Sequence, residues 1–212
     1  MIPHKDPLER PHLELGLLFH LRGGPLGRRT LVERTHWTES VVRTELEKLE
    51  ALGWVEFEKP GTFLSDAATI TLDEFFARVP RVAEIELVEI GLDRAACGAL
   101  VRGVTHAPKT WQVRDAAVRE GASGILLLSR EPSGLKLTDV DASFSRRNSH
   151  DAARVETALG PSEVGDWVVI VFAGDAGRAS AGLWRALRDI VPAPALDRAP
   201  RSHARQAGRG AS

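Results

Sequence analysis

Gly53 marks a change in apolar spacing that constrains the fold more than any other feature of this sequence. Before it, apolar residues recur at the 3.6-residue period of amphipathic helices. Directly after it they alternate with polar residues, as in a half-buried strand. The first helical stripe is Leu13, Leu17, Leu18 and Leu21, and Gly23-Gly24-Pro25 ends that helix. A second, shorter helix is expected over residues 26–34.

A third helix is expected to begin after Thr38, whose hydroxyl can accept a hydrogen bond from a free backbone amide of the first turn. Its buried stripe consists of Val42, Leu46, Leu49 and Leu52. Residues 54–58 then alternate in polarity, Pro60-Gly61 turns the chain, and residues 62–64 return as a second strand. A capping box at residues 71–74 predicts a further helix that ends before Pro80.

Three helices followed by a two-stranded hairpin is the order of a winged-helix domain, which we predict for residues 11–80. The third helix would be the recognition helix, and residues 59–61 would form the tip of the wing. The same pattern also fits a generic helical bundle with a chance hairpin, and the sequence leaves that alternative open. Residues 1–10 are polar and are expected to form a flexible arm.

After Pro80 the pattern changes to interleaved strands and helices. Strands are expected over residues 85–90, 96–104, 125–128, 135–137 and 168–172, and helices over residues 112–120, 149–159 and 175–191. We predict an α+β fold in which residues 81–191 form a two-layer sandwich, with a mostly antiparallel sheet and helices against one face. This unit is expected to fold separately and to serve dimerisation or effector binding. Residues 192–212, rich in proline, alanine, arginine and glycine, are expected to be a disordered basic tail.

Residues 168–172 are apolar at five consecutive positions, so both faces of that strand must be covered. Helices cover only one face of a two-layer sandwich, and a second copy of the chain is the simplest cover for the other face. We therefore expect a homodimer with the open face of the sheet in its interface.

Composition narrows the class of protein. The formal net charge is −1, so nothing global marks a nucleic-acid or membrane protein. The start of the sequence does not resemble a signal peptide, and no run of about 18 apolar residues is present, so a cytoplasmic protein without a membrane segment is expected. The single cysteine, Cys97, excludes an internal disulfide and a multi-cysteine zinc site.

Motifs for enzymatic chemistry are missing from the sequence. It holds no glycine-rich nucleotide-binding motif, no pair of histidines at metal-ligand spacing and no nucleophile elbow. Ser180 precedes Gly182, but Arg178 stands where the elbow needs glycine. We therefore expect no enzyme, no cofactor and no metal.

The third predicted helix would present an exposed polar face to double-stranded DNA. Arg43 could contact a guanine, and Ser40 and Thr44 could contact bases or phosphates. The other DNA-binding candidates are Arg28 and Arg29 at the start of the second helix, Thr38 and Lys48 on the third, and Lys59 at the wing tip. Residues 1–80 hold 10 basic and 13 acidic residues, a net charge of −3, which opposes DNA binding.

The loop after the second predicted strand is the best candidate for an effector site. It leads into a helix and gathers polar groups beside an aromatic ring, a mixture that suits a small anion. The candidate residues are His106, Lys109, Trp111, Arg114 and Asp115. Arg114 and Asp115 could equally be a local pair on the helix.

Several segments resemble an archaeal winged-helix family, domain of unknown function 4443. In the first half they are residues 25–29, 39–44 and 49–54; in the second half they are residues 114–118, 121–124 and 166–170. The resemblance extends over about residues 13–191. It implies a winged helix joined to a small α+β domain of the GAD-like or DCoH-like kind, and it implies no reaction or ligand.

These observations favour a DNA-binding transcription regulator whose second domain dimerises or senses a ligand. The alternative is a winged-helix adaptor that binds proteins, which the acidic third helix favours. An enzyme with an appended winged helix is a third hypothesis, against which the missing catalytic motifs stand.

Overall fold

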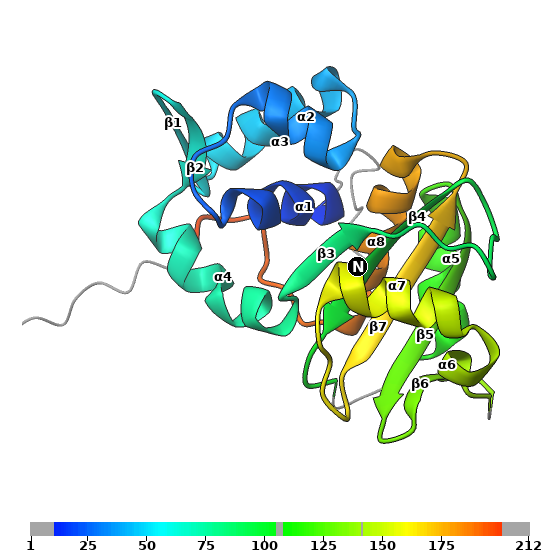
Figure 1. Cartoon of the computed structure of the whole chain (residues 1–212). Coiled ribbons are helices and arrows are strands. Elements are labelled where there is room, and N and C mark those ends of the chain that lie inside the picture. The colour runs from blue at the N-terminus through cyan, green and yellow to red at the C-terminus, as the bar shows by residue number, and fades with distance from the viewer. Residues whose placement is uncertain (1–10, 105–107, 141, 201–212) are drawn as a thin grey trace, which may run out of the picture.

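A computed structural model describes residues 11–104, 108–140 and 142–200 (Figure 1). The N-terminal unit consists of helices α1 (Pro11–Leu21), α2 (Arg28–Thr35) and α3 (Glu39–Ala51), followed by strands β1 (Val55–Glu58) and β2 (Gly61–Leu64). The two strands pair in antiparallel register. The predicted order of three helices and a hairpin is therefore present.

Local chemistry sets these boundaries. The Thr38 hydroxyl accepts a hydrogen bond from the Val41 amide at 3.4 Å and caps α3, as expected. The hairpin gains a third segment, because Leu26 and Thr62 exchange two backbone hydrogen bonds of 2.9 Å each. A Cβ on Gly61 would lie 2.6 Å from the Leu26 carbonyl oxygen, so only glycine permits this pairing.

Helix α4 (Asp66–Arg78) begins earlier than the sequence predicted. The Ser65 hydroxyl accepts from the Ala68 amide at 3.2 Å and caps the helix. The predicted capping box at residues 71–74 is wrong, since Thr71 lies inside the helix and its hydroxyl donates to the Ala67 carbonyl. Ser65 and Thr71 are both possible N-cap residues. The helix begins after the first of them, Ser65.

The second half is built on a five-stranded sheet. It contains β3 (Arg81–Glu84), β4 (Ala95–Val101), β5 (Ala122–Glu131), β6 (Gly134–Leu137) and β7 (Trp167–Ala173) in the spatial order β3-β4-β7-β5-β6. Every neighbouring pair is antiparallel. The α+β class and the antiparallel sheet are confirmed.

Residues 85–90 form a loop and not the predicted strand. The buried carboxylate of Asp151 accepts from the backbone amides of Val88, Glu89 and Ile90 at 2.8–3.0 Å. These three amides therefore turn toward one side chain instead of a neighbouring strand, and the strand moves upstream to β3.

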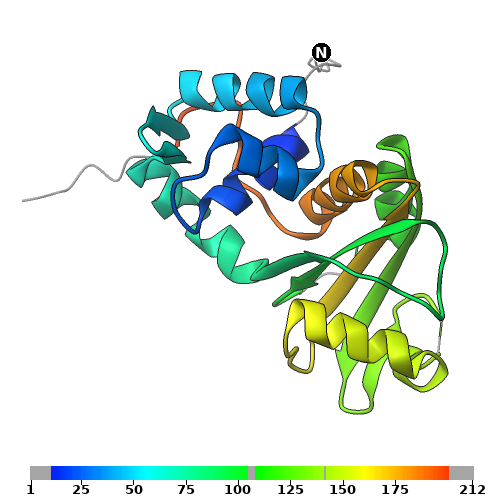
Figure 2. The same ribbon diagram turned by 45° about the horizontal axis from the view of Figure 1, so that its top comes forward.

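Helices cover both faces of the sheet (Figure 2), so the expectation of helices on one face is wrong. Helices α5 (Thr110–Arg119) and α8 (Ala176–Ile190) pack on one face, against Val169 and Val171 of β7. Helices α6 (Phe144–Arg147) and α7 (Ser149–Leu159) cover the other, against Val168 and Ile170. The apolar run of β7 is thus buried within one chain, and it no longer argues for a dimer.

The two halves of the chain share one apolar core, because α8 packs against α1 as well as against the sheet (Figure 2). The rings of Phe19 and Trp184 lie 5.1 Å apart between their centroids. Trp37 donates from Nε1 to the Gly177 carbonyl at 3.2 Å. Because the two halves share this core, we expect them to unfold together as one cooperative unit, and not as the separately folding domains that the sequence predicted.

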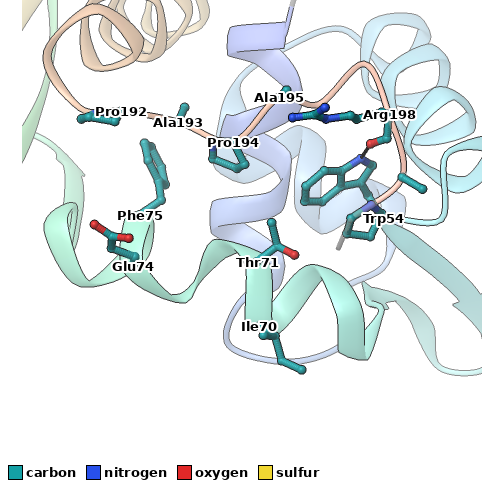
Figure 3. A pocket seen from close by; sticks show the side chains of 12 residues that line it. Trp54, Ile70, Thr71, Glu74, Phe75, Pro192, Ala193, Pro194, Ala195 and Arg198 are labelled. Atoms are coloured by element: carbon teal, nitrogen blue, oxygen red, sulfur yellow. Dashed lines mark hydrogen bonds between the residues drawn. The ribbon is translucent and has the colours of Figure 1, made fainter. Parts of the chain in front are cut away.

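Residues 192–200 form a strap that runs from the end of α8 along α4 to Trp54 (Figure 3). Leu196 is only 3% exposed, and Trp54 Nε1 donates to the Arg198 carbonyl at 2.9 Å. The expectation of disorder from residue 192 is therefore wrong up to residue 200, because one leucine and small apolar neighbours suffice to dock the segment. Residues 201–212, and the predicted arm at residues 1–10, lie outside the described residues.

Gly16 should be essential for the packing of α1 on α8. A Cβ at this position would lie 2.6 Å from Trp37 Cη2 and 2.9 Å from Trp184 Nε1. Because both rings are buried, Gly16→Ala should lower the free energy of unfolding by about 2 kcal/mol despite better helix propensity. Gly23→Ala, where the new Cβ meets nothing within 4 Å, is the control. Urea unfolding measures the stability of both variants, and equal stabilities would contradict this account of how α1 packs on α8.

The strap should contribute measurably to stability. Leu196→Ala should cost about 2–3 kcal/mol in thermal or urea unfolding, because the leucine is buried. The exposed neighbour Asp197 supplies the control Asp197→Ala, which should change stability by less than about 0.5 kcal/mol. A neutral Leu196→Ala variant would mean that the strap is not docked in solution.

Candidate nucleic-acid interface

Helix α3 lies on the side of the N-terminal unit that is turned away from the sheet (Figure 2). Val42, Leu46 and Leu49 face inward and are buried. The opposite face exposes Glu39, Ser40, Arg43, Thr44 and Glu47. The candidates Ser40, Arg43 and Thr44 are therefore together on the accessible N-terminal part of this helix, as the apolar spacing predicted.

Helix α2 brings two further candidates to the start of α3. Arg28 Nη1 lies 4.0 Å from the Glu39 carboxylate, which joins the first turns of both helices. Arg29 pairs with Glu33 on its own helix at 3.0 Å. Gly27 has no side chain to cap α2, so the first amides of this helix have no side-chain acceptor among the residues that the structure describes. This end of α2 is suited to an anion.

The remaining candidates differ in how available they are. Arg43 lies 3.8 Å from Glu47, and both side chains are largely exposed. Lys48 turns to the buried carboxylate of Glu45 at 3.1 Å, so it is less free to reach a ligand. The Thr38 hydroxyl is occupied by the cap of α3 and by Ser40 at 3.1 Å. Thr38 therefore caps α3 and Lys48 pairs with Glu45. The sequence alone could not show that these structural roles compete with DNA binding at the two residues.

Lys59 is exposed in the turn between β1 and β2. The hairpin carries Glu56 and Glu58 beside it, and Phe57 is 41% exposed. The whole surface thus mixes cations with exposed carboxylates, which are Glu33, Glu39, Glu47, Glu50, Glu56 and Glu58. Exposed ion pairs of this kind contribute only about 0–1 kcal/mol each, so a competing phosphate could replace the carboxylates.

The expected effector residues are only partly brought together. Helix α5 begins at Thr110, so Trp111 belongs to a helix and not to the predicted loop. Trp111 and Asp115 line a groove between α5 and α8, whereas Arg114 pairs with Asp115 at 3.7 Å and does not line it. Lys109 precedes α5 and is exposed. His106 lies outside the described residues.

Sequence reasoning missed three arginines in the same groove, Arg119, Arg185 and Arg188. A signal was available, because Trp111, Asp115 and Arg119 recur at four-residue spacing and so share one face of α5. Arg185 and Arg188 are three residues apart and likewise share one face of α8. That the two faces meet could not be known without the packing of the helices.

Other reactive groups are held in structural positions. Burial raises the pKa of the Cys97 thiol to about 12, so it stays protonated and inert. Burial also lowers the pKa of His20 to about 4, with Arg34 and Arg22 adding to the effect. Within residues 11–104, 108–140 and 142–200, no three histidine, cysteine or acidic side chains gather as a metal site. No helix in this part of the chain could cross a membrane.

Comparisons with known proteins bear on the fold. Residues 92–190 match the model of the family described as Domain of unknown function (DUF4443). This is the family that the sequence resembles, and the match covers the second half from the loop before β4 to the end of α8.

Solved structures are similar to this chain, and one of them matches over most of its length. It is a hypothetical protein, PH0730, from Pyrococcus horikoshii OT3, with a TM-score of 0.68 and 21% sequence identity. The similarity covers 84% of this chain and 91% of that one, and at this identity it shows the fold alone. Among curated proteins, none matches the chain.

Thr38, the residue before α3, and Thr44, within the helix, should separate a capping role from a surface role. Thr38→Ala should lower stability by about 1 kcal/mol, because the amide of Val41 loses its acceptor. Thr44→Ala, at an exposed position within the helix, should be neutral or slightly stabilising. Thermal unfolding of both variants tests the assignment. A larger loss at Thr44 than at Thr38 would contradict it.

Proposed function

We propose that this protein is a winged-helix transcription regulator that binds double-stranded DNA through α3. The observation that carries the proposal is the exposed N-terminal part of α3, where Ser40, Arg43 and Thr44 lie together. Arg28 approaches it from α2. The N-terminal residues of a recognition helix are those that reach base edges in the major groove.

In this proposal Arg43 reads a guanine, and Ser40 and Thr44 contact bases or nearby phosphates. Arg28, Arg29 and Lys59 bind phosphates on either side. Thr38 serves the reading helix indirectly by capping it. Each arginine exchanges its carboxylate partner for the more strongly charged DNA backbone. That exchange is feasible because these pairs are exposed and individually weak.

A homodimer in the cytoplasm belongs to the same proposal, because regulators of this kind pair two half-sites on the duplex. The argument for a dimer now rests on DNA geometry and not on the sheet, whose faces are both covered by helices.

A protein-binding adaptor is the second candidate. The observation that favours it is the excess of exposed carboxylates on α3 and on the hairpin. These groups repel DNA phosphates and would suit a basic protein surface. Both candidates use the same face of α3, and one set of variants can therefore distinguish them.

DNA binding should be salt-dependent and should depend on the named cations. After selection of a genomic sequence, fluorescence anisotropy should give a log–log salt slope of about −0.9 for each phosphate contact. Arg28→Gln and Lys59→Gln should each reduce the slope by about 1, whereas Arg43→Gln should mainly weaken the selected sequence relative to random DNA. Arg146→Gln on α6 is the charge-matched control.

Glu47→Gln adds a second arm to this experiment. It removes an exposed carboxylate beside Arg43 and should tighten binding to random DNA. If no duplex is selected and none of the variants alters binding to random DNA, the DNA proposal is wrong and the adaptor is favoured.

A further inference from the structure

The groove between α5 and α8 has a defined register. The two helices run antiparallel, because Gly182 of α8 approaches the Ala117 carbonyl while Arg178 reaches Gly121 at the end of α5. The outer faces of the helices line an open groove with a volume of about 580 Å³. Its charged and aromatic lining residues are Trp111, Asp115, Arg119, Arg185, Arg188 and Asp189.

The charges in this groove do not cancel. Arg185 donates to Asp189 at 2.8 Å, and Asp115 lies 3.7 Å from Arg114 outside the groove. Arg119 and Arg188 form no ion pair with another residue in the described part of the chain. Two guanidinium groups are therefore left to attract an anion, and the planar guanidinium matches phosphate oxygens in geometry.

Trp111 adds an aromatic surface to these charges. It is 56% exposed, although Val113 and Ala117 of the same helix are fully buried. A large ring that the core does not use is available for stacking. The antiparallel register sets Arg188 across from the Trp111 end of the groove, and arginine also stacks on planar rings.

We propose that this groove binds a phosphate monoester that carries a planar ring, the chemistry of a mononucleotide. The ring lies between Trp111 and Arg188, and the phosphate lies at Arg119. Positions 111 and 119 are about 12 Å apart along the helix axis at 1.5 Å per residue, and side chains on a helix lean back toward its N-terminus. Both side chains lean the same way, so a mononucleotide has to span about this distance between Trp111 and Arg119. The volume falls in the ordinary range of small-ligand sites.

Calorimetric titration of the full chain tests this directly. The probes are adenosine monophosphate, adenosine and inorganic phosphate, with the monophosphates of the other three bases as further arms. Adenosine monophosphate or one of the other monophosphates should bind at least tenfold more tightly than adenosine or inorganic phosphate alone. The titration contains no DNA, so its outcome is independent of the proposed DNA binding.

Two substitutions test which residue contacts the phosphate and which contacts the ring of the ligand. Arg119→Gln should weaken the monophosphate at least tenfold and leave adenosine unchanged, whereas Trp111→Leu should weaken both. Arg146→Gln on α6, beyond the opposite face of the sheet, loses the same charge and should have no effect. All three positions are exposed, and circular dichroism checks that the fold is retained.

Three results would overturn the proposal. They are the absence of binding by all four monophosphates at millimolar concentration, equal binding of inorganic phosphate, and equal losses in Arg119→Gln and Arg146→Gln. Quenching of tryptophan fluorescence by the ligand, lost in Trp111→Leu, would support the stacking at Trp111.

Discussion

The close approach of α1 and α8 is the contact on which the arrangement of this molecule depends. It is possible because Gly16 has no side chain where the rings of Trp37 and Trp184 meet the helix. Burial of these two rings and of Phe19 joins the N-terminal helices to the sheet as one core. Dispersion and hydrophobic burial of large aromatic rings outweigh the helix propensity that a glycine gives up.

Helix α8 contributes residues to two different parts of the molecule. The inner face of α8 contributes Leu183 and Trp184 to the shared core, and its outer face carries Arg185 and Arg188 into the groove with α5. The strap starts at the C-terminal end of α8 and reaches Trp54, which lies between α3 and β1 in the sequence. Arg185 and Arg188 of the proposed ligand site also lie near this C-terminal end, so the groove and the strap that docks beside the proposed DNA-reading helix start from the same end of α8, which supplies a physical route for coupling between them.

Much of the fold was predictable from local chemistry. The cap at Thr38, the stripe of Val42, Leu46 and Leu49, and the alternation after Gly53 correctly gave α3 and the hairpin. The apolar run of β7 correctly indicated a strand covered on both faces. The competing caps at Ser65 and Thr71 misplaced the start of α4, and the hydrogen bonds of Asp151 removed a predicted strand at residues 85–90.

The sequence by itself determined where most helices and strands lie, because periodicity and capping are local properties of the chain. It also placed Ser40, Arg43 and Thr44 on one exposed face of α3, since a helix fixes the neighbours at three and four residues. Only the tertiary structure decided that helices cover both faces of the sheet, that residues 192–200 dock on Trp54, and that Trp111 and Arg119 of α5 line one groove with Arg185 and Arg188 of α8. These features join residues far apart in the chain, and they follow from which apolar faces find each other, a choice that no local pattern contains.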